Sequence, residues 1–323
     1  MKSNEQLLSQ VESYISQIAL PEEPKRLYEP ITYTLTGGGK RLRPMLTMLA
    51  CGIFCDDTQH ALPAAAAIEI FHNFTLLHDD IMDNAPIRRS KPTVHAAWGQ
   101  NVAILSGDVM MILAYSYLNS LPAKYLPDVL ARFNRFAIDV CEGQQYDMDF
   151  EGEEVVSIEE YMRMIELKTS VLLGGATVVG AILGDATAEQ RAKLDKFATE
   201  LGLAFQLQDD LLDSYGDEAL GKSIGGDILE GKKTFLMITA LNRANDEERQ
   251  KLKTIYKDST KSDAEKIAEV KAIYDALDVP RLTEELISAK FNDALAILDS
   301  LDVEPQRIVA MRQYAEGLVD RKS

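Results

Sequence analysis

An acidic pattern, Asp-Asp-x-x-Asp, occurs twice in this chain, each time inside an apolar helical stretch, and it constrains the fold more than any other feature. The first copy occupies residues 79–83 and the second occupies residues 209–213. Positions i and i+4 of a helix share a face, so the outer aspartates of each copy point the same way. Their neighbours are isoleucine, methionine and leucine, which are typical of a buried helix. A fold for this chain must therefore neutralise two groups of carboxylates beside its core.

Nearly every other segment shows helical rather than alternating periodicity. A single apolar stripe predicts a helix over residues 4–19, and it comprises Leu7, Leu8, Val11, Tyr14, Ile15 and Ile18. Pro63 is expected to open the helix of the first acidic cluster and Pro86 to end it. Further helices are predicted over 25–36, 44–54, 100–119, 124–150, 158–183, 187–215, 232–243, 247–256, 262–277, 280–299 and 304–320. Four of them are expected to begin with capping boxes, which are Ser157 with Glu160, Thr187 with Gln190, Asn245 with Glu248 and Ser262 with Glu265.

No strand-like alternation, Rossmann-type unit or linker is visible, so the sequence predicts an all-α helical bundle in a single domain over residues 1–323. The formal charge of −17 argues against a nucleic-acid partner, which would favour a basic face. Cys51 and Cys55 lie in an apolar run and are interpreted as buried thiols, which fits a reducing, cytoplasmic compartment. The polar N-terminus lacks a signal-peptide core, and no apolar run of membrane-spanning length is visible.

The acidic clusters could be solvated helix faces in an acidic protein. Two observations argue against that interpretation. No lysine or arginine lies at i±4 within either cluster to relieve the repulsion, and the pattern occurs twice with identical spacing. Carboxylates this close together call for a hard divalent cation such as Mg²⁺, whose remaining ligands are commonly phosphate oxygens. The two clusters therefore predict a cation-bridged diphosphate.

The basic residues fall into groups that suit phosphate binding. Lys40, Arg41 and Arg43 follow a triple glycine. Arg88, Arg89 and Lys91 follow the first acidic cluster. Lys222 and Lys232 flank the glycine-containing segment after the second acidic cluster. Cations at a helix C-terminus would explain Arg88 and Arg89 alone. A nucleotide P-loop at residues 37–40 is excluded because Arg41 replaces the required Ser or Thr and no strand precedes it. His72 alone could be an ordinary core histidine, and Lys168 alone could extend along an apolar surface to solvent.

Six ordered motifs together resemble the trans-polyprenyl diphosphate synthase family over roughly residues 5 to 320. They are Gly38-Gly39-Lys40-Arg41-Leu42-Arg43-Pro44, His78-Asp79-Asp80-Ile81-Met82-Asp83 with Arg88-Arg89, Gly107-Asp108, Lys168-Thr169, Gln206 with Asp209-Asp210-Leu211-Leu212-Asp213, and Gly221-Lys222, Asp227, Gly231-Lys232. The resemblance implies a helical bundle around a deep central cavity, a homodimer, and head-to-tail condensation of isopentenyl diphosphate with an allylic diphosphate.

The resemblance also implies roles for single residues. Asp79, Asp83 and Asp209 would be the main ligands of three Mg²⁺ ions, with Asp80, Asp210 and Asp213 supporting them. The allylic diphosphate would be held by Arg88, Lys168, Lys222 and Lys232. Isopentenyl diphosphate would be held by Lys40, Arg43, His72 and Arg89. The oxygens of Thr169 and Gln206 would face the developing carbocation. A dry apolar cavity would protect that cation from water, and the proton lost afterwards can go to the departing pyrophosphate.

Residues just upstream of the first acidic cluster set the length of the product in this family. Phe74 is a bulky candidate for the floor of the tunnel, with Phe71 one turn deeper, although Phe74 could equally be ordinary core. The chain lacks the two-residue insertion between Asp80 and Asp83 that bacterial farnesyl diphosphate synthases commonly have. The pattern is similar to archaeal-type C20 synthases, so geranylgeranyl diphosphate is favoured and farnesyl diphosphate is the alternative.

Two other functions fit part of the pattern. A class I terpene cyclase shares the first acidic motif and the bundle, but it usually has a different second metal motif and lacks the basic group at residues 40–43. A regulatory subunit of a heteromeric synthase tends to lose one acidic cluster, whereas this chain keeps both.

Overall fold

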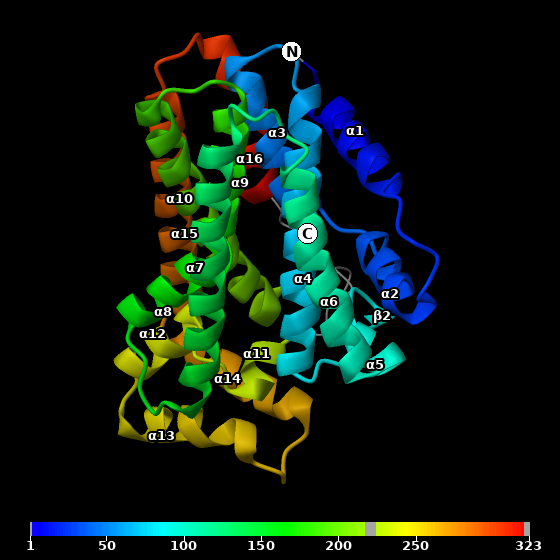
Figure 1. Ribbon diagram of the computed structural model, residues 1–323. Helices are drawn as coiled ribbons and strands as arrows, with labels where there is room; N and C mark the ends of the chain where they lie inside the picture. The colour runs from blue at the N-terminus through cyan, green and yellow to red at the C-terminus, as the bar shows by residue number, and fades with distance from the viewer. Residues whose placement is uncertain (1, 217–223, 320–323) are drawn as a thin grey trace. The chain divides into compact units, whose positions relative to one another are not determined.

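The computed structural model describes residues 2–216 and 224–319, and these residues form helices joined by short loops (Figure 1). The predicted all-α class is confirmed. The one departure among the described residues is a hairpin of two short strands, β1 (Ile87–Arg88) and β2 (Lys91–Pro92), which the sequence did not predict. Two-residue strands are too short to carry the alternating pattern by which a strand is recognised.

The chain divides into two compact units, each of which is described by itself. Unit 1 comprises residues 1–134, 175–195 and 301–314, and unit 2 comprises residues 135–174, 196–300 and 315–323. The single domain expected over residues 1–323 stays a prediction.

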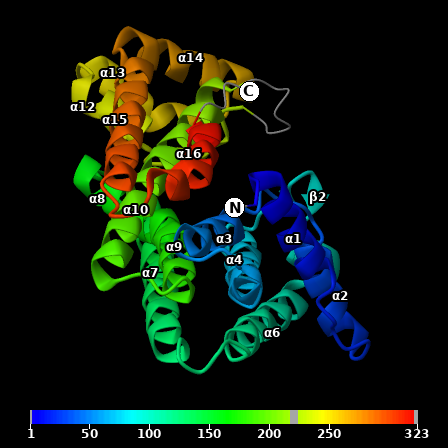
Figure 2. The same cartoon turned by 90° about the horizontal axis from the view of Figure 1, so that it is seen from above.

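Unit 1 is built around a long helix, α4 (Leu62–Met82), which packs along α6 (Gln100–Leu118) and α3 (Leu42–Phe54). Shorter elements lie against these three helices, and they are α1 (Asn4–Ser16), α2 (Lys25–Leu35), η1 (Gln59–Ala61) and α5 (Val94–Trp98). Figure 2 shows α1 and α2 following one another along this unit. The run of small side chains at residues 64–67 is buried, which lets α4 approach its neighbours closely.

Unit 2 contains helices that pack around a buried apolar cluster with Tyr161 and Tyr274 among its largest side chains. Its own elements are α8 (Ile158–Ile165), η2 (Glu166–Ser170), α11 (Gly226–Glu230), α12 (Phe235–Arg243), α13 (Asp246–Thr254), η4 (Ile255–Lys257), α14 (Asp263–Ala276) and α15 (Val279–Asp299). Four further helices contribute residues to both units, and they are α7 (Leu126–Gly152), α9 (Val171–Leu183), α10 (Ala188–Tyr215) and α16 (Pro305–Val319). Within unit 2, α12 packs against α15, α13, α14 and α8.

The local signals predicted most helix starts correctly. All four predicted capping boxes are present, with reciprocal hydrogen bonds between the first side chain and the residue three positions later. Pro63 lies in the first turn of α4, where its missing N–H has no intrahelical partner to lose. The helix expected over 158–183 is present as one continuous stretch, and residues 166–170 within it form the π-helical turn η2.

Two helical stretches are, by length and composition, long and apolar enough to cross a membrane, which the sequence analysis missed. They are Gln100–Leu118 and Ile158–Leu183, and core helices of water-soluble proteins meet the same criteria. The second stretch is 78% buried within the protein, whereas only 33% of the first is buried. Helix α6 therefore carries an apolar surface that its own unit leaves exposed.

Candidate active site

The first acidic cluster lies at the C-terminal end of α4. Asp79 is half-buried, Asp80 is buried, and Asp83 is exposed at the helix C-cap. Arg88 donates from Nε to Asp80 Oδ1 at 2.6 Å and from Nη2 to Asp79 Oδ2 at 3.2 Å. The sequence contained no basic residue one turn away to relieve the repulsion; the structure supplies one from the following hairpin.

The hairpin directs the Arg88 side chain back toward α4, and the backbone of its turn is strained. Arg88 pairs with Lys91, and the two residues between them, Arg89 and Ser90, have φ values of 52° and 59°. Both central residues at positive φ define a type I′ turn, which favours Asn-Gly. The left-handed conformation costs roughly 1–2 kcal/mol for a residue with a side chain. Such strain concentrates where a side chain must be aimed at a functional site.

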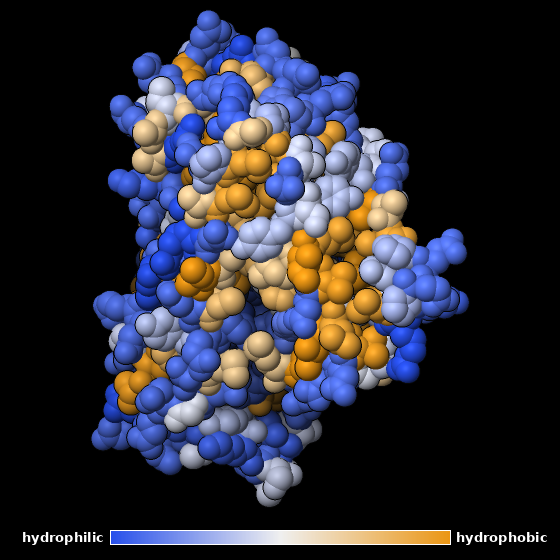
Figure 3. Space-filling view, in the orientation of Figure 1, coloured by the Kyte–Doolittle hydropathy of each residue, from blue (hydrophilic) through white to orange (hydrophobic). Residues whose placement is uncertain are grey.

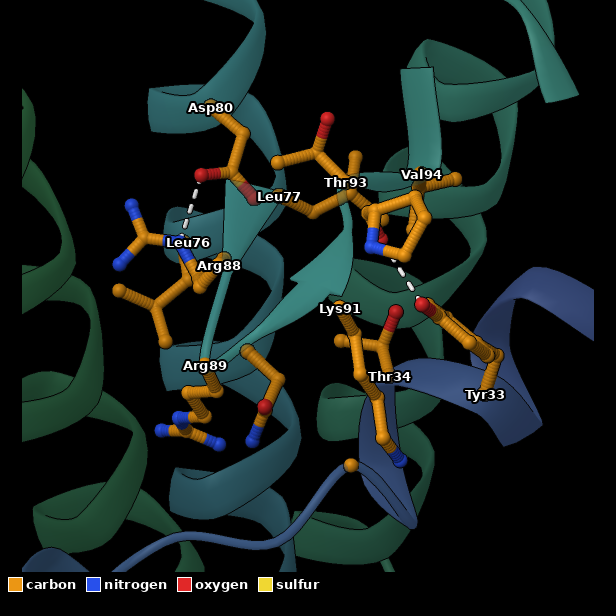
Figure 4. Close-up of a pocket in the computed structure, with 13 residues that line it drawn as sticks. Tyr33, Thr34, Leu76, Leu77, Asp80, Arg88, Arg89, Lys91, Thr93 and Val94 are labelled. Atoms are coloured by element: carbon orange, nitrogen blue, oxygen red, sulfur yellow. Dashed lines mark hydrogen bonds and ion pairs between the residues drawn. The ribbon is translucent and has the colours of Figure 1, made fainter. Parts of the chain in front are cut away.

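A pocket opens beside this hairpin (Figure 4). Its walls come from α2, α4 and the hairpin, and they comprise Tyr33, Thr34, Gly37, Asn73, Leu76, Leu77, Asp80, Arg88, Arg89, Lys91, Pro92, Thr93 and Val94. Figure 4 shows Arg88 and Arg89 on the same side of the hairpin, with Arg88 reaching Asp80. The pocket thus joins the acidic cluster to a set of guanidinium groups.

Arg43, on the first turn of α3, extends this basic group. Its Nη1 lies 3.1 Å from His72 Nε2, and because guanidinium can only donate, His72 Nε2 accepts. Arg89 donates to the carbonyl of Gly38, and a Cβ on Gly39 would lie 2.9 Å from Arg89 Nη1. Of the three glycines, Gly39 is therefore the one against which Arg89 packs, since a Cβ on Gly38 would meet nothing within 4 Å.

The electrostatics of this basic group favour an anion. Burial, followed by the charges of Arg43, Arg89, Arg88 and Arg41, holds the pKa of His72 well below its ordinary value, so the imidazole is neutral. Burial lowers the pKa of Arg43 to about 10, and it stays charged at neutral pH. Among the residues that the structure describes, neither Arg43 nor Arg89 has a carboxylate within salt-bridge distance. Two cations beside a neutral histidine thus have no directly ion-paired carboxylate in the described part of the chain.

Arg41, a member of the first predicted basic group, has a structural role instead. Arg41 is buried and its Nη1 donates to Glu69 Oε1 at 2.7 Å, while its Nη2 donates to the carbonyl of Leu35 at 2.8 Å. Asn73 donates to the same Glu69 carboxylate at 3.2 Å. Arg41 therefore fixes the start of α3 on α4 and is not available to a phosphate, unlike Arg43. Lys40 is exposed, as a side chain that meets a substrate from solvent can be.

The two phenylalanines upstream of the cluster differ in burial. Phe71 is fully buried and packs against Phe133, with ring centroids 5.2 Å apart. Phe74 is half-buried, and its ring lies 4.6 Å from that of His78. His78 in turn occupies the space of a missing side chain, since a Cβ on Gly107 would lie 2.4 Å from His78 Nε2. Phe71 is thus core, and Phe74 is the one of the two that retains exposed surface.

The second acidic cluster lies near the end of α10, in unit 2. Asp210 is buried and accepts hydrogen bonds from the Tyr161 hydroxyl and from Gln206 Nε2, the latter at 2.9 Å. Burial, with the nearby charge of Asp227, raises the pKa of Asp210 to about 7. Asp209 and Asp213 are half-buried. The middle aspartate is therefore held in the protein interior and the outer two reach the surface of the helix.

A hydrogen-bonded chain fixes the two polar residues predicted to face a carbocation. Thr169 Oγ1 donates to Gln206 Oε1 at 3.0 Å, and Gln206 donates onward to Asp210. Because Thr169 donates its only hydroxyl proton to Gln206, the lone pairs of Thr169 Oγ1 remain available as acceptors on the sides that do not face Gln206. The orientation of the Gln206 amide is set at both ends.

Lys168 and Thr169 lie in the π-helical turn, a feature that is frequent at functional sites. Lys168 Nζ contacts Asp147 Oδ2 on α7 at 2.5 Å. Two glycines make room for the turn, because a Cβ on Gly143 would lie 2.3 Å from the Lys168 backbone nitrogen and one on Gly202 would lie 2.7 Å from Ser170 Oγ. The widened turn and its close glycine neighbours could not be found from apolar periodicity.

The segment after the second cluster is tied back to it. Asp213 Oδ2 accepts from the backbone N–H of Asp227 at 3.0 Å, and Lys232 Nζ lies 3.7 Å from Asp227 Oδ1. Although burial lowers it, the charges of Asp227, Asp147 and Asp210 raise the pKa of Lys232, which stays protonated. Lys222, predicted to hold a diphosphate, lies outside the described residues.

Both acidic clusters offer only carboxylate oxygens, which fits Mg²⁺ rather than a soft metal. Over residues 2–216 and 224–319, the one close trio of metal-binding side chains is elsewhere, at Cys51, Cys55 and His60. Water and phosphate oxygens are the ligands that would complete the coordination of a Mg²⁺ ion held by one or two of these carboxylates. Asp147 and Tyr161, which contact Lys168 and Asp210, were missed by the sequence analysis, since no local spacing connects them to residues 168 or 210.

Comparisons with known proteins agree with this geometry. The Polyprenyl synthetase family model matches residues 24–277. The chain is 42% identical over 246 residues to a short chain isoprenyl diphosphate synthase of Methanocaldococcus jannaschii, covering 76% of this chain and 75% of that protein. It is 36% identical over 317 residues to a geranylgeranyl pyrophosphate synthase of Geoglobus acetivorans, covering 96% of each. A crystal structure of a geranylgeranyl pyrophosphate synthase superposes with a TM-score of 0.93 at 38% identity, covering 100% of both chains.

Proposed function

Since this chain belongs to the polyprenyl synthetase family, we propose that it condenses isopentenyl diphosphate head-to-tail with an allylic diphosphate and releases pyrophosphate. The observation that carries the proposal is in unit 1. Arg43 and Arg89, two cations without a carboxylate partner among the described residues, lie at the helix that bears Asp79 and Asp83. A site that brings cations from α3 and the hairpin to the helix of the carboxylates suits a diphosphate bound together with Mg²⁺.

Asp79 and Asp83 in the first cluster, and Asp209 in the second, would be the main ligands of Mg²⁺, with three ions expected per active site. Asp80, Asp210 and Asp213 support these ligands, since each is engaged by Arg88, Tyr161 or the backbone of Asp227. When bound by these residues, Mg²⁺ would supply electrostatic neutralisation of the leaving diphosphate, which would lower the barrier to breaking the allylic C–O bond.

The basic residues divide between the two diphosphates. Lys40, Arg43, His72 and Arg89 bind isopentenyl diphosphate. The neutral His72 accepts from Arg43 and so holds its guanidinium in place, while its own Nδ1–H remains as a donor to phosphate. Arg88, Lys168, Lys222 and Lys232 bind the allylic diphosphate.

Thr169 and Gln206 stabilise the allylic cation through their oxygens. The hydrogen bond from Thr169 to Gln206 turns the threonine lone pairs away from its partner, and Asp210 holds the other end of the amide. The proton lost after carbon–carbon bond formation passes to the departing pyrophosphate, so no further base is needed.

The favoured product is geranylgeranyl diphosphate, and farnesyl diphosphate is the alternative. Phe74 limits the length, because it keeps exposed surface while Phe71 is engaged with Phe133 in the core. Replacing Phe74 by Ala is expected to lengthen the product by at least one five-carbon unit, and Phe71→Ala serves as the matched control that loses core packing instead. An unchanged product length in Phe74→Ala would remove Phe74 from this role.

One assay tests the function. The protein is incubated with Mg²⁺, isopentenyl diphosphate and allylic diphosphates of five, ten and fifteen carbons, and the products are separated by chain length. Linear prenyl diphosphates of up to twenty carbons are expected. Cyclic hydrocarbons would identify a terpene cyclase, and inactivity without a second chain would identify a regulatory subunit; either result contradicts the proposal.

The active form is a homodimer in the cytoplasm, and the exposed face of α6 forms its interface. Helix α6 exposes apolar side chains in unit 1, namely Ile104, Leu105, Ile112 and Tyr115. Figure 3 shows apolar surface gathered in the region of this helix. Leu105→Asp with Ile112→Asp is expected to give monomers in sedimentation analysis, whereas Val155→Asp, at an apolar residue that is 73% exposed elsewhere, should not. A dimer that persists in the α6 variant would exclude this face.

A further inference from the structure

A second group of metal-binding side chains lies at the opposite end of α3 and α4 from the acidic cluster. Cys51 is in the last turn of α3, Cys55 is its C-cap, and His60 lies in η1, just before α4. The three side-chain donor atoms all lie within 4.8 Å of one another. From these positions we infer a binding site for a thiophilic divalent cation, with Zn²⁺ as the physiological ion.

The distances match those that a tetrahedral ion imposes. The two Sγ atoms are 3.4 Å apart, and Cys51 Sγ is 3.9 Å from His60 Nε2. Zn–S bonds of about 2.3 Å and Zn–N bonds of about 2.0 Å at tetrahedral angles place two sulfurs roughly 3.8 Å apart and sulfur and nitrogen roughly 3.6 Å apart. Small side-chain adjustments therefore suffice to bring all three atoms onto one ion, and water can fill the fourth position.

The surroundings suit a buried cation that is reached from solvent. Cys51 is fully buried, while Cys55 and His60 are half-buried, so an ion can enter past them. The backbone is packed tightly behind the cluster, since a Cβ on Gly184 would lie 2.9 Å from the carbonyl of Cys51. His60 Nε2 lies 2.9 Å from the carbonyl of Leu183, a hydrogen bond that the ring gives up when the same nitrogen binds the ion.

Charge balance also favours this site. Binding Zn²⁺ releases one proton from each thiol, and the imidazole moves its proton from Nε2 to Nδ1 while staying neutral. Two thiolates then cancel the ion's charge, so the loaded site is neutral in a largely buried place. The sulfur ligands discriminate against Mg²⁺, which prefers oxygen, so this site and the acidic clusters take different ions.

A redox-active pair is the competing interpretation of Cys51 and Cys55. Burial raises the pKa of both thiols above the ordinary value, so they remain protonated at neutral pH. Reactive cysteines show the opposite shift, because the thiolate is the species that attacks or is oxidised. A bound metal ion, in contrast, deprotonates its thiol ligands outright.

The site would act on structure rather than on the reaction. Asp79 is seventeen positions along α4 from Leu62, which corresponds to roughly 25 Å at 1.5 Å per residue. An ion bound by Cys51, Cys55 and His60 therefore fastens the end of α3 to the start of α4. It stabilises the helix pair whose far ends carry Arg43 and the first acidic cluster.

Cobalt substitution tests the site directly. The reduced full-length protein is stripped of metal, supplied with excess Mg²⁺ to occupy the acidic clusters, and titrated with Co²⁺. Thiolate-to-cobalt charge-transfer absorption is expected to saturate at one ion per chain, and Zn²⁺ should displace it. Cys55→Ser should abolish the band, and His60→Gln should weaken Co²⁺ binding at least 10-fold. Cys141→Ser, which removes the exposed third thiol, is the matched control and should leave the band intact.

Thermal unfolding provides a second readout that does not depend on the spectrum. Zn²⁺ is expected to raise the Tm of the native protein and of Cys141→Ser, but not that of Cys55→Ser. Mg²⁺ alone should change the Tm of all three proteins by the same amount. Absence of the charge-transfer band, its survival in Cys55→Ser, or its loss in Cys141→Ser would overturn the proposal. A protein that does not bind Co²⁺ but whose two thiols are oxidised by hydrogen peroxide to a disulfide, with release of two water molecules, would also overturn the proposal. The two cysteines would then be a redox pair.

Discussion

The two acidic clusters share one sequence pattern but differ in how the protein manages their charge. In the first cluster, the middle aspartate, Asp80, is neutralised by a full opposite charge on Arg88. In the second, Asp210 is held by the uncharged groups of Tyr161 and Gln206, and burial raises its pKa to about 7. The outer aspartates are more exposed than the middle one in both. The Asp-Asp-x-x-Asp spacing thus specifies which aspartates are exposed to a ligand. The neighbouring side chains determine how the buried middle aspartate is stabilised.

The largest expected effects separate outer from middle aspartates. Asp79→Ala and Asp209→Ala should each lower kcat by about 10²- to 10³-fold, because each removes a Mg²⁺ ligand that stabilises charge in the transition state. Asp80→Asn and Asp210→Asn should cost about 10-fold, as supporting partners of a metal site do. Steady-state kinetics at saturating Mg²⁺ measures this. Equal losses of kcat at the outer and middle aspartates would contradict the division into metal ligands and supporting residues.

Removing the Tyr161 hydroxyl should destabilise the protein, because the buried Asp210 carboxyl is held by uncharged hydrogen-bond donors and not by an opposite charge. Tyr161→Phe leaves the buried Asp210 with one hydrogen bond fewer, which is expected to cost about 1–3 kcal/mol of unfolding free energy. Tyr274→Phe is the matched control, since this buried tyrosine of unit 2 has no carboxylate partner among the described residues. Urea unfolding compares the two. A smaller loss for Tyr161→Phe than for Tyr274→Phe would mean that the hydrogen bond contributes nothing.

The basic group around the first cluster should produce its own pH dependence. The folded-state pKa of His72 lies well below that of the unfolded chain, about 6.5. As pH falls below about 6.5, the unfolded chain therefore binds a proton that the folded protein does not, and stability declines by up to about 1.4 kcal/mol per pH unit. His72→Gln should flatten the slope of unfolding free energy against pH between pH 7 and pH 5. Parallel slopes in native protein and His72→Gln would show that His72 is not held neutral.

The smallest expected effect concerns the strained hairpin that delivers Arg88. Ser90→Gly relieves a positive φ and should raise the unfolding free energy by up to about 1 kcal/mol, with kcat unchanged. Gly99→Ala is the opposite change at another positive φ with open space around it, and it should destabilise. Thermal unfolding distinguishes the two signs. Destabilisation by Ser90→Gly would mean that the serine side chain, rather than the turn, holds the hairpin.

Much of the helical framework followed from local signals. The capping boxes at Ser157, Thr187, Asn245 and Ser262 fixed four helix starts, because the two hydrogen bonds of each box join residues only three apart. The faces of the acidic helices followed from the i, i+4 geometry alone. The π-helical turn at residues 166–170 did not, since it depends on the close approach of α7 at Gly143 and of α10 at Gly202.

The sequence by itself determined the all-α class, the two acidic faces and the set of basic residues around them, because these depend on helical periodicity and on spacing. Tertiary structure decided which members of each set can serve a ligand. It turned Arg41 inward to Glu69 while leaving Arg43 against His72, and it brought Arg88 back to Asp80 through a two-residue turn. It also placed His60 beside Cys51 and Cys55 across the end of a helix. Contacts of this kind join residues by packing and backbone direction, neither of which local spacing encodes.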